Sequence, residues 1–281
     1  NWLKPSTRLD IKYQIGQAYE QGGVYEPAIK YYSEVLNKVY SYRDTKEGKE
    51  RLIKEKLPSE ELLNLRLAVA EDQSNNFSKA FDFLKAIKNP NKLTEQQQVE
   101  RIMLASTLYD KRGDVDSAIL YLTELLKYWK GQPELVAAPY FKLSQLELRK
   151  DKRADAIESL KQVDNLMADT GLVSEEIHRN SLQQIAKIYD EDKNYDQAIV
   201  WYEKLLDRYE DKVPLASIRY RLGKIYFNIG KIQKASSVWS QFKGENSDSW
   251  KKIAKEQIRS YEWMNKNKKF IDRLPASQGK P

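Results

Sequence analysis

Residues 213–242 read VPLASIRYRLGKIYFNIGKIQKASSVWSQF, and this stretch decides the fold. Its first half carries a small residue, Gly223, among large apolar ones, and its second half carries Trp239 four positions after Ala235. Residues three and four positions apart lie on one face of an α-helix, so each half predicts a helix with an apolar face. Gly230 lies between the halves and favours a tight turn. The stretch therefore predicts two helices that pack closely at their small residues.

The same pattern occurs six times along the 281-residue chain. A recurring alanine marks each unit, at Ala28, Ala80, Ala118, Ala156, Ala198 and Ala235. Twelve positions before each alanine stands a small residue, which is Gly16, Ala68, Ser106, Ser144, Ala186 or Gly223. A random position holds Gly, Ala or Ser about one time in five, so six matches have a chance on the order of one in ten thousand. The sequence therefore predicts six related helix-turn-helix units.

A turn residue stands five positions before each alanine, at Gly23, Asn75, Gly113, Asp151, Lys193 and Gly230. Five of these six are residue types that tolerate a left-handed backbone, and Lys193 is the exception. The segment 43–58 interrupts the pattern between the first two units, and we expect it to form a helical extension and a loop.

The motifs of two units resemble the tetratricopeptide repeat. They are Leu222-Gly223-x-x-Tyr226 with Gly230, Ala235 and Trp239, and Ile15-Gly16-x-x-Tyr19 with Gly23, Ala28 and Tyr32. The resemblance implies an all-α fold, a right-handed superhelical solenoid of about six helix-turn-helix units with a C-terminal capping helix. The alanines are 52, 38, 38, 42 and 37 residues apart, against about 34 in the standard unit, which indicates longer helices or connections. Glu71 and Glu147 replace the expected tyrosine, so the second and fourth units are degenerate.

We expect the repeats to fill residues 1–247. Their approximate boundaries are 9–42, 59–90, 95–131, 134–168, 174–211 and 214–246. Residues 248–272 carry an apolar stripe beside several lysines and are expected to form the capping helix, and residues 273–281 a fraying, flexible tail.

Several residues predict where helices begin. Thr94 starts a capping-box pattern. Ser59 and Ser174 each precede two glutamates and are expected to cap helix N-termini. Pro133 and Pro214 suit the first turn of a helix.

The composition excludes most catalytic and metal sites. The chain holds one His and no Cys, which removes thiol nucleophiles and most zinc sites. It has no phosphate-binding glycine loop and no nucleophile elbow. We interpret His178 as a surface residue near a helix N-terminus, and Asp190-Glu191-Asp192 as a solvated turn rather than a calcium loop. The sequence therefore predicts a protein that is not an enzyme and needs no metal or cofactor.

Solenoids of this kind line a concave groove with the first helix of each unit. The resemblance implies that the groove residues flank the small residue of each unit. They are Tyr13, Gln17, Leu65, Val69, Met103, Thr107, Phe141, Gln145, Gln183, Lys187, Tyr220, Arg221 and Lys224. An apolar and aromatic stripe suits an extended peptide or a partner helix, so our hypothesis is a protein–protein interaction scaffold. The alternative for any one of these residues is that it packs against a neighbouring repeat.

The stretch 213–242 and the segment DSWKKIAKEQI at 248–258 resemble repeats of bacterial envelope proteins. Among these are outer-membrane assembly lipoproteins and the periplasmic partner of the Tol–Pal system. The resemblance favours the bacterial periplasm or cell envelope over the cytoplasm. Tyr13 and Gln17 stand where some family members carry the Lys and Asn that grip chaperone tails, so a chaperone-tail receptor is not expected. Residues 1–5 contain no Met and no leader, which indicates a fragment or a processed product.

The net charge of +7 is unevenly distributed. Residues 61–215 hold 22 basic and 27 acidic side chains, whereas residues 216–281 hold 15 basic and 5 acidic ones, a net +10. A basic C-terminal end suits an acidic protein surface, anionic lipid or nucleic acid. The alternative is a solubilising end, which we favour over nucleic acid because no dense basic run and no interleaved base-stacking aromatics are present.

Two further expectations concern the rest of the protein. No apolar stretch approaches the ~18 residues of a membrane-spanning helix, so no membrane span is expected. A regulatory repeat module of a larger catalytic protein stays an alternative to the free-standing scaffold.

Overall fold

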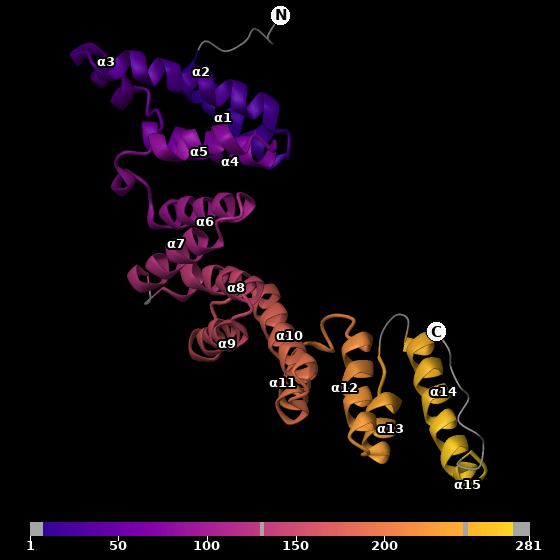
Figure 1. The fold of residues 1–281 in the computed structure, drawn as a ribbon. Helices are drawn as coiled ribbons and strands as arrows, with labels where there is room; N and C mark the ends of the chain where they lie inside the picture. The colour runs from indigo at the N-terminus through magenta and orange to yellow at the C-terminus, as the bar shows by residue number, and fades with distance from the viewer. Residues whose placement is uncertain (1–7, 130–131, 244–246, 272–281) are drawn as a thin grey trace, which may run out of the picture. The chain divides into compact units, whose positions relative to one another are not determined.

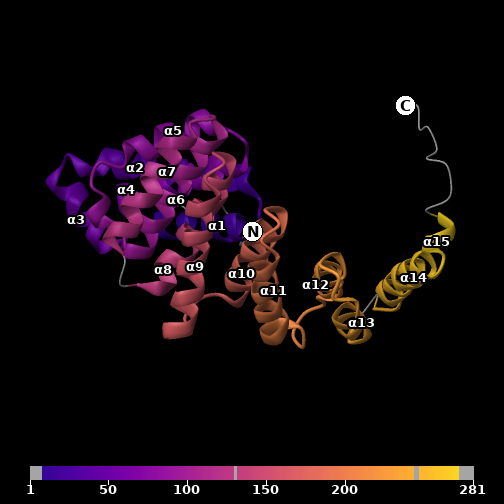
Figure 2. The ribbon, with the colours of Figure 1, turned by 60° about the horizontal axis from the view of Figure 1, so that its bottom comes forward.

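The structure is a computed structural model that describes residues 8–129, 132–243 and 247–271. Within these residues every regular element is a helix (Figures 1 and 2), which confirms the predicted all-α fold. The chain divides into two compact units, Asn1–Lys152 and Arg153–Pro281. Each unit has its own buried hydrophobic clusters, and the two are described separately.

The first unit is built from helix pairs. Its elements are α1 (Leu9–Gln21), α2 (Tyr25–Arg43), α3 (Lys46–Lys54), α4 (Glu60–Gln73), α5 (Phe77–Ala86), the short 3₁₀-helix η1 (Pro90–Lys92), α6 (Glu95–Lys111), α7 (Val115–Tyr128) and α8 (Pro133–Arg149). Helix α1 packs along α2, α4 along α5 and α6 along α7 (Figure 1). The pairs are joined because α2 also packs against α4, and α4 against α6.

The second unit continues the same arrangement. Its elements are α9 (Arg153–Thr170), α10 (Glu175–Glu191), α11 (Tyr195–Tyr209), α12 (Ala216–Asn228), α13 (Ile232–Ser240), α14 (Ser247–Lys266) and α15 (Lys268–Ile271). Helix α10 packs along α11, and α12 along α13. Helix α14 contacts both α12 and α13, so it covers the last pair in the way expected of a capping helix.

The exact division into repeats stays a prediction. The expected fourth repeat, 134–168, includes the point where the two compact units meet in sequence. The ends of two expected repeats at 131 and 244–246, the last residue of the expected capping segment and the tail 273–281 lie outside the described residues.

Small residues let the paired helices approach closely. All six repeat-marking alanines have an exposed fraction of 0%. A Cβ atom on Gly16 would lie 2.7 Å from the ring of Tyr32, and one on Gly223 would lie 2.2 Å from the indole of Trp239. In the second case the indole Nε1 also donates a hydrogen bond to the carbonyl of Tyr220 at 3.0 Å. The predicted register of small and aromatic residues is therefore confirmed.

The turns expected in the six repeats share one backbone conformation. All six expected turn residues have a positive φ, from 56° at Asp151 to 83° at Gly113. Lys193, the type least suited to this conformation, adopts it as well, with a φ of 58°. A side chain with a Cβ is strained there, so the tertiary fold overrides the local preference of this lysine.

Most of the expected helix starts are confirmed. Thr94 forms a complete capping box with the third residue of α6, and the Ser59 hydroxyl accepts a hydrogen bond from a backbone N–H of α4. Pro133 is the first residue of α8. Ser174 stands at the expected N-cap position of α10, but its side chain makes no capping hydrogen bond. The expectation is wrong for Pro214, which precedes the first residue of α12 by two positions.

The insertion at 43–58 contains the expected helical extension and loop. Helix α2 continues to Arg43, and a further helix, α3, begins after Thr45. The Thr45 hydroxyl accepts a hydrogen bond from the backbone N–H of Gly48 at 3.0 Å, which satisfies one of the free donors at the start of α3.

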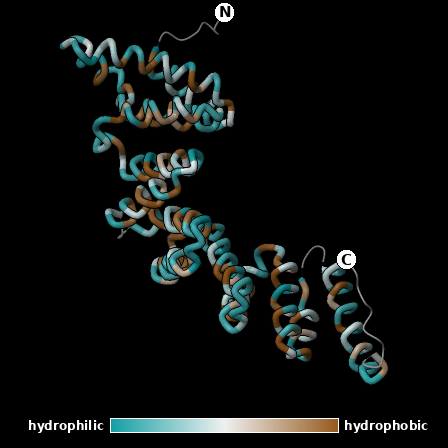
Figure 3. The backbone as a smooth tube through the Cα atoms, viewed as in Figure 1, coloured by the Kyte–Doolittle hydropathy of each residue, from teal (hydrophilic) through white to brown (hydrophobic). Residues whose placement is uncertain are grey.

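Hydrophobic residues are interrupted by hydrophilic ones along the helices of the described chain (Figure 3). Among these residues, no helix is long and apolar enough to cross a membrane.

Candidate functional site

A groove in the first unit is the candidate binding site. It is a cavity of about 570 Å³ lined by residues of α1, α4, α6 and α8, together with the residues just before α6. It brings together Tyr13, Gln17 and Met103, three of the residues that the sequence predicts for the groove. We call this cavity the first-unit groove. Its size lies within the ~300–1,000 Å³ range typical of ligand pockets.

Two residues that line the first-unit groove, Arg66 and Glu100, belong to an ionic cluster. The Arg66 guanidinium donates from Nη1 to Glu20 Oε1 at 3.0 Å and from Nη2 to a carboxylate oxygen of Glu100. Glu20 also accepts a hydrogen bond from the hydroxyl of Tyr32 at 2.6 Å. The buried Arg66 Nε has no hydrogen-bond partner among the described residues, but one cation faces two carboxylates in this cluster. It fixes the walls of the groove and leaves no free positive charge for an anionic ligand.

The groove has an apolar lining, part of which comes from the proline-containing helix α8. Leu62, Met103, Leu135 and Pro139 line the cavity. Pro139 lies inside α8 and has no N–H, so the carbonyl of Leu135 lacks the donor that it would have in an ordinary helix. Both residues line the groove and add to its apolar surface.

Burial changes the chemistry of Tyr13 in the same cavity. Its hydroxyl is removed from water, which raises the pKa of Tyr13 above its usual value. The ring lies 5.7 Å from that of Tyr32, centroid to centroid. Tyr13 is thus a neutral aromatic wall of the groove at physiological pH.

Several residues that the sequence predicts for the groove do not line this cavity. Leu65 has an exposed fraction of 0% and belongs to the core, so the prediction that it lines a groove is wrong. Val69 packs against the same cluster. The Thr107 hydroxyl donates to the carbonyl of Met103 at 3.0 Å, within its own helix. Phe141 is half-buried and Gln145 is exposed, and neither lines the cavity.

Sequence reasoning missed Arg66, Glu100, Leu135 and Pro139, which the structure places in the groove. The signal for α4 is the four-residue spacing of Leu62 and Arg66, which puts both on one helix face. The groove face of α4 therefore carries 62 and 66 rather than the predicted 65 and 69.

The predicted residues of the second unit differ in their surroundings. Gln183, Lys187 and Lys224 are exposed. The Tyr220 hydroxyl donates to Gln257 Oε1 of α14 at 3.0 Å, and its ring packs between those of Trp239 and Trp250, with centroids 5.6 and 5.0 Å away. Tyr220 is thus engaged in contacts with the capping helix.

Arg221 and Asp190 form an ion pair, with the Asp190 side chain only 9% exposed. Asp190 and Glu191 belong to α10, so the prediction of a solvated turn at these two residues is wrong.

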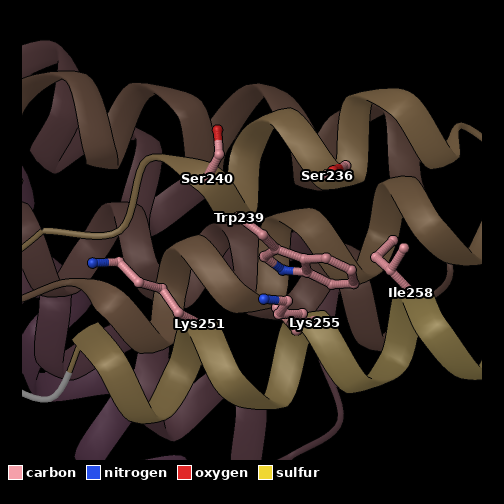
Figure 4. A pocket seen from close by; sticks show the side chains of 7 residues that line it. Ser236, Trp239, Ser240, Lys251, Lys255 and Ile258 are labelled. Carbon is pink, nitrogen blue, oxygen red and sulfur yellow. The ribbon is translucent and has the colours of Figure 1, made fainter.

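A second pocket, of about 300 Å³, lies between α13 and α14. Trp239, Ala254 and Ile258 form its apolar part, and Lys251 and Lys255 stand on the α14 side (Figure 4). Ser236 and Ser240 add hydroxyls from α13; we call this site the α13–α14 pocket. Lys251 is 3.3 Å from Asp248, an exposed pair that contributes little.

His178 is buried rather than exposed, so its interpretation as a surface residue is wrong. Its exposed fraction is 1%, and its ring nitrogens lie 2.6 Å from the Tyr209 hydroxyl and 2.9 Å from Asp164 Oδ1. Asp164 also accepts a hydrogen bond from Lys204 at 2.5 Å. Burial alone raises the pKa of Asp164, but the hydrogen bonds from His178 and Lys204 outweigh it and hold the pKa below its usual value.

Both ring nitrogens of His178 are hydrogen-bonded in this buried network, so neither is free to act on a substrate. Within the described residues, no group of His, Cys, Asp and Glu side chains could hold a metal ion. The network is therefore structural, and it ties α9, α10 and α11 together.

Comparison with known proteins identifies the repeats. Residues 10–40 and 180–212 match models described as tetratricopeptide repeat. Curated protein sequences yield no match. Among solved structures, PilF of Pseudomonas aeruginosa is 16% identical with a TM-score of 0.56, covering 83% of this chain and 90% of its own.

Two other solved structures share the fold. A STAND ATPase with a tetratricopeptide repeat sensor from Pyrococcus horikoshii is 16% identical with a TM-score of 0.59, covering 94% of this chain and 43% of its own. A tetratricopeptide repeat protein from Parabacteroides merdae ATCC 43184 is 11% identical with a TM-score of 0.54, covering 97% of this chain and 96% of its own. These similarities show the solenoid fold.

Proposed function

We propose that this chain, which contains tetratricopeptide repeats, is a non-enzymatic scaffold that binds a peptide or a partner helix in its first-unit groove. Tetratricopeptide repeat proteins generally mediate protein–protein interactions. The observation that carries the proposal is the cavity of about 570 Å³ in which Tyr13, Gln17 and Met103 meet.

The groove chemistry favours a partner with apolar anchors. Arg66 is already paired with two carboxylates, so the central charge is compensated. Leu62, Met103 and Leu135 offer apolar contacts to such anchors. Buried apolar anchors of this kind contribute most of the binding energy in peptide grooves.

A matched pair of variants tests this proposal. Leu135→Glu places a charge in the groove, whereas Leu120→Glu places the same charge on α7, where Leu120 is 57% exposed and outside the cavity. We expect affinity capture with quantitative mass spectrometry to lose the specific partner with Leu135→Glu and to retain it with Leu120→Glu. Circular dichroism checks that both variants keep their helices. Equal capture by both variants contradicts the groove.

A second candidate function rests on the α13–α14 pocket. Lys251 and Lys255 flank an apolar floor in a segment of net charge +10, which suits an acidic, partly apolar segment of a partner protein. Anionic lipid and nucleic acid are the competing ligands for the same charge. Lys255→Glu should weaken binding to an acidic peptide, with Lys266→Glu outside the pocket as the control.

Two broader proposals concern the setting. A bacterial envelope complex is supported by the repeat style of residues 213–258. A regulatory module of a larger catalytic protein is supported by the similar STAND ATPase, which has a tetratricopeptide repeat sensor. Localisation of the tagged full-length protein separates the envelope from the cytoplasm.

A further inference from the structure

We propose that a second cavity of the first unit, distinct from the first-unit groove, binds a small apolar ligand that carries one carboxylate. The cavity has a volume of about 240 Å³ and lies among α5, α6 and α7. Arg101 enters it from α6, and we call it the Arg101 pocket. The proposal is independent of peptide binding in the groove, because the two cavities share no lining residue.

Arg101 is the cation that carries the inference. Its Nε atom is buried and has no hydrogen-bond partner within the described part of the chain. The residues that line the pocket include no Asp or Glu. Arg66 also has a buried Nε without a partner, but its Nη atoms pair with two carboxylates, and Arg219 pairs with Glu210. A guanidinium that is desolvated without a counter-charge is unfavourable, and a bound anion removes that cost.

The burial of Arg101 also changes its pKa. Burial lowers the pKa of Arg101, and only the neighbouring Tyr121 hydroxyl opposes this effect. Even so, a guanidinium remains charged at physiological pH. The pocket thus holds a permanent positive charge in an environment of low polarity, where its attraction for an anion is strengthened.

Aromatic rings form the walls of the Arg101 pocket. The Phe81 and Tyr109 rings meet edge to face, with centroids 5.1 Å apart and an angle of 82° between their planes. The rings of Tyr109 and Tyr121 stack at 5.2 Å. Leu84 adds an aliphatic wall from α5. These surfaces suit the body of an aromatic or aliphatic ligand rather than a bare hydrated ion.

Two further cations lie beside the Phe81 wall. The Lys85 ammonium is 6.0 Å from the Phe81 ring centroid, and the Arg112 guanidinium carbon is 4.8 Å from it. Both raise the local positive potential and attract an anion toward the pocket. The planar fork of Arg101 matches the geometry of a carboxylate, which can accept two hydrogen bonds from it.

The size of the pocket limits the ligand. Its volume lies below the ~300–1,000 Å³ of pockets for drug-sized molecules. A ligand about as large as one amino-acid residue fits this space. Apolar walls, one enclosed guanidinium and this volume together indicate a small aromatic or aliphatic monocarboxylate.

Phenylacetate and phenylacetamide are the matched probes, because they share one apolar body and differ in charge. We expect isothermal titration calorimetry on the full chain to show binding of phenylacetate at least about tenfold tighter than that of phenylacetamide. Phenylacetate should also raise the melting temperature. Equal binding of the two probes, or no binding of phenylacetate at millimolar concentration, overturns the proposal. Displacement of phenylacetate by equimolar inorganic phosphate also overturns it, because it indicates a general anion site.

Arg101→Gln and Lys127→Gln assign the effect to this pocket. Lys127 is exposed on α7 and does not line the cavity, so its variant controls for the loss of one positive charge. We expect Arg101→Gln to weaken phenylacetate binding by about tenfold or more and Lys127→Gln to leave it unchanged. Without ligand, Arg101→Gln should keep or raise the melting temperature, because it removes an uncompensated cation. A lowered melting temperature, or unchanged phenylacetate binding, contradicts a ligand-binding role.

Discussion

Gly223 controls how closely α12 and α13 approach. Its missing side chain leaves room for the Trp239 indole, whose Nε1 bonds to the carbonyl of Tyr220. Gly223→Leu forces these helices apart, and we expect the free energy of unfolding to fall by about 1–3 kcal/mol or more. Chemical denaturation measures this change. Ser217→Leu, at an exposed position of the same helix, is the control, and an equal loss for both contradicts the close packing at Gly223.

The Asp164 carboxylate links pH to stability. Its pKa in the folded protein is below its unfolded value of about 4, because His178 and Lys204 donate hydrogen bonds to it. The stability that it contributes is therefore present above the unfolded pKa and is lost as the pH falls through the folded pKa. Asp164→Asn should be less stable than the original protein at neutral pH, with a difference that shrinks in acid. Denaturation curves from neutral to acidic pH measure it.

Asp169→Asn is the matched control for that series, because Asp169 is exposed in the same helix. A difference for Asp164→Asn that stays constant down to the acidic end contradicts the linkage.

The burial of His178 depends on partners that are distant in the sequence. Its partners, Asp164 and Tyr209, are 14 and 31 positions away in the sequence. No local spacing connects them, and they meet only because α9, α10 and α11 pack together. A surface position near a helix start was the reasonable prediction from the neighbouring glutamates alone.

At the scale of elements, Lys193 stores strain in the turn between α10 and α11. Its φ of 58° is one that glycine adopts freely and lysine does not. We expect Lys193→Gly to raise the free energy of unfolding by about 0.5–1 kcal/mol. The glycine removes the backbone strain, and the higher entropy of the unfolded glycine chain offsets part of that gain. Lys193→Ala keeps the Cβ and should give no gain. Thermal denaturation that shows equal effects for both variants contradicts this account.

Helix faces explain why the groove was predicted only in part. On α1 the predicted positions 13 and 17 do line the cavity. On α4 the cavity uses Leu62 and Arg66, because Leu65 turns into the core. Leu65 is one position from Arg66, and a shift of one position turns a side chain to another face of a helix. The repeat pattern fixes which helices pair, and the exact rotation of each helix depends on its neighbours.

At the scale of the whole molecule, the fold was predictable because one physical requirement recurs. Each pair needs small residues at its contact and a turn that reverses the chain, and both signals are written six times in the sequence. The contacts of α14 lie outside this repeat pattern. For that reason the occupation of Tyr220 by the capping helix could not be read from its position in the repeat.

The two compact units lead to a prediction about fragments. Each has its own buried clusters, and repeat proteins are stabilised mainly by contacts between neighbouring units. We expect residues 1–152 and 153–281, expressed separately, to keep their helices and cooperative melting. Circular dichroism and amide NMR spectra measure this, with the intact chain as reference. A fragment with a collapsed, poorly dispersed amide spectrum contradicts the prediction.

The stacking of Tyr220 between Trp239 and Trp250 has an optical consequence. The emission of a tryptophan depends on the polarity and mobility of its surroundings, and Trp239 also lines the α13–α14 pocket. We therefore expect a molecule that enters this pocket, or a loosening of α14, to change the fluorescence emission of Trp239. The end of the chain thus carries a built-in fluorescent reporter that needs no label.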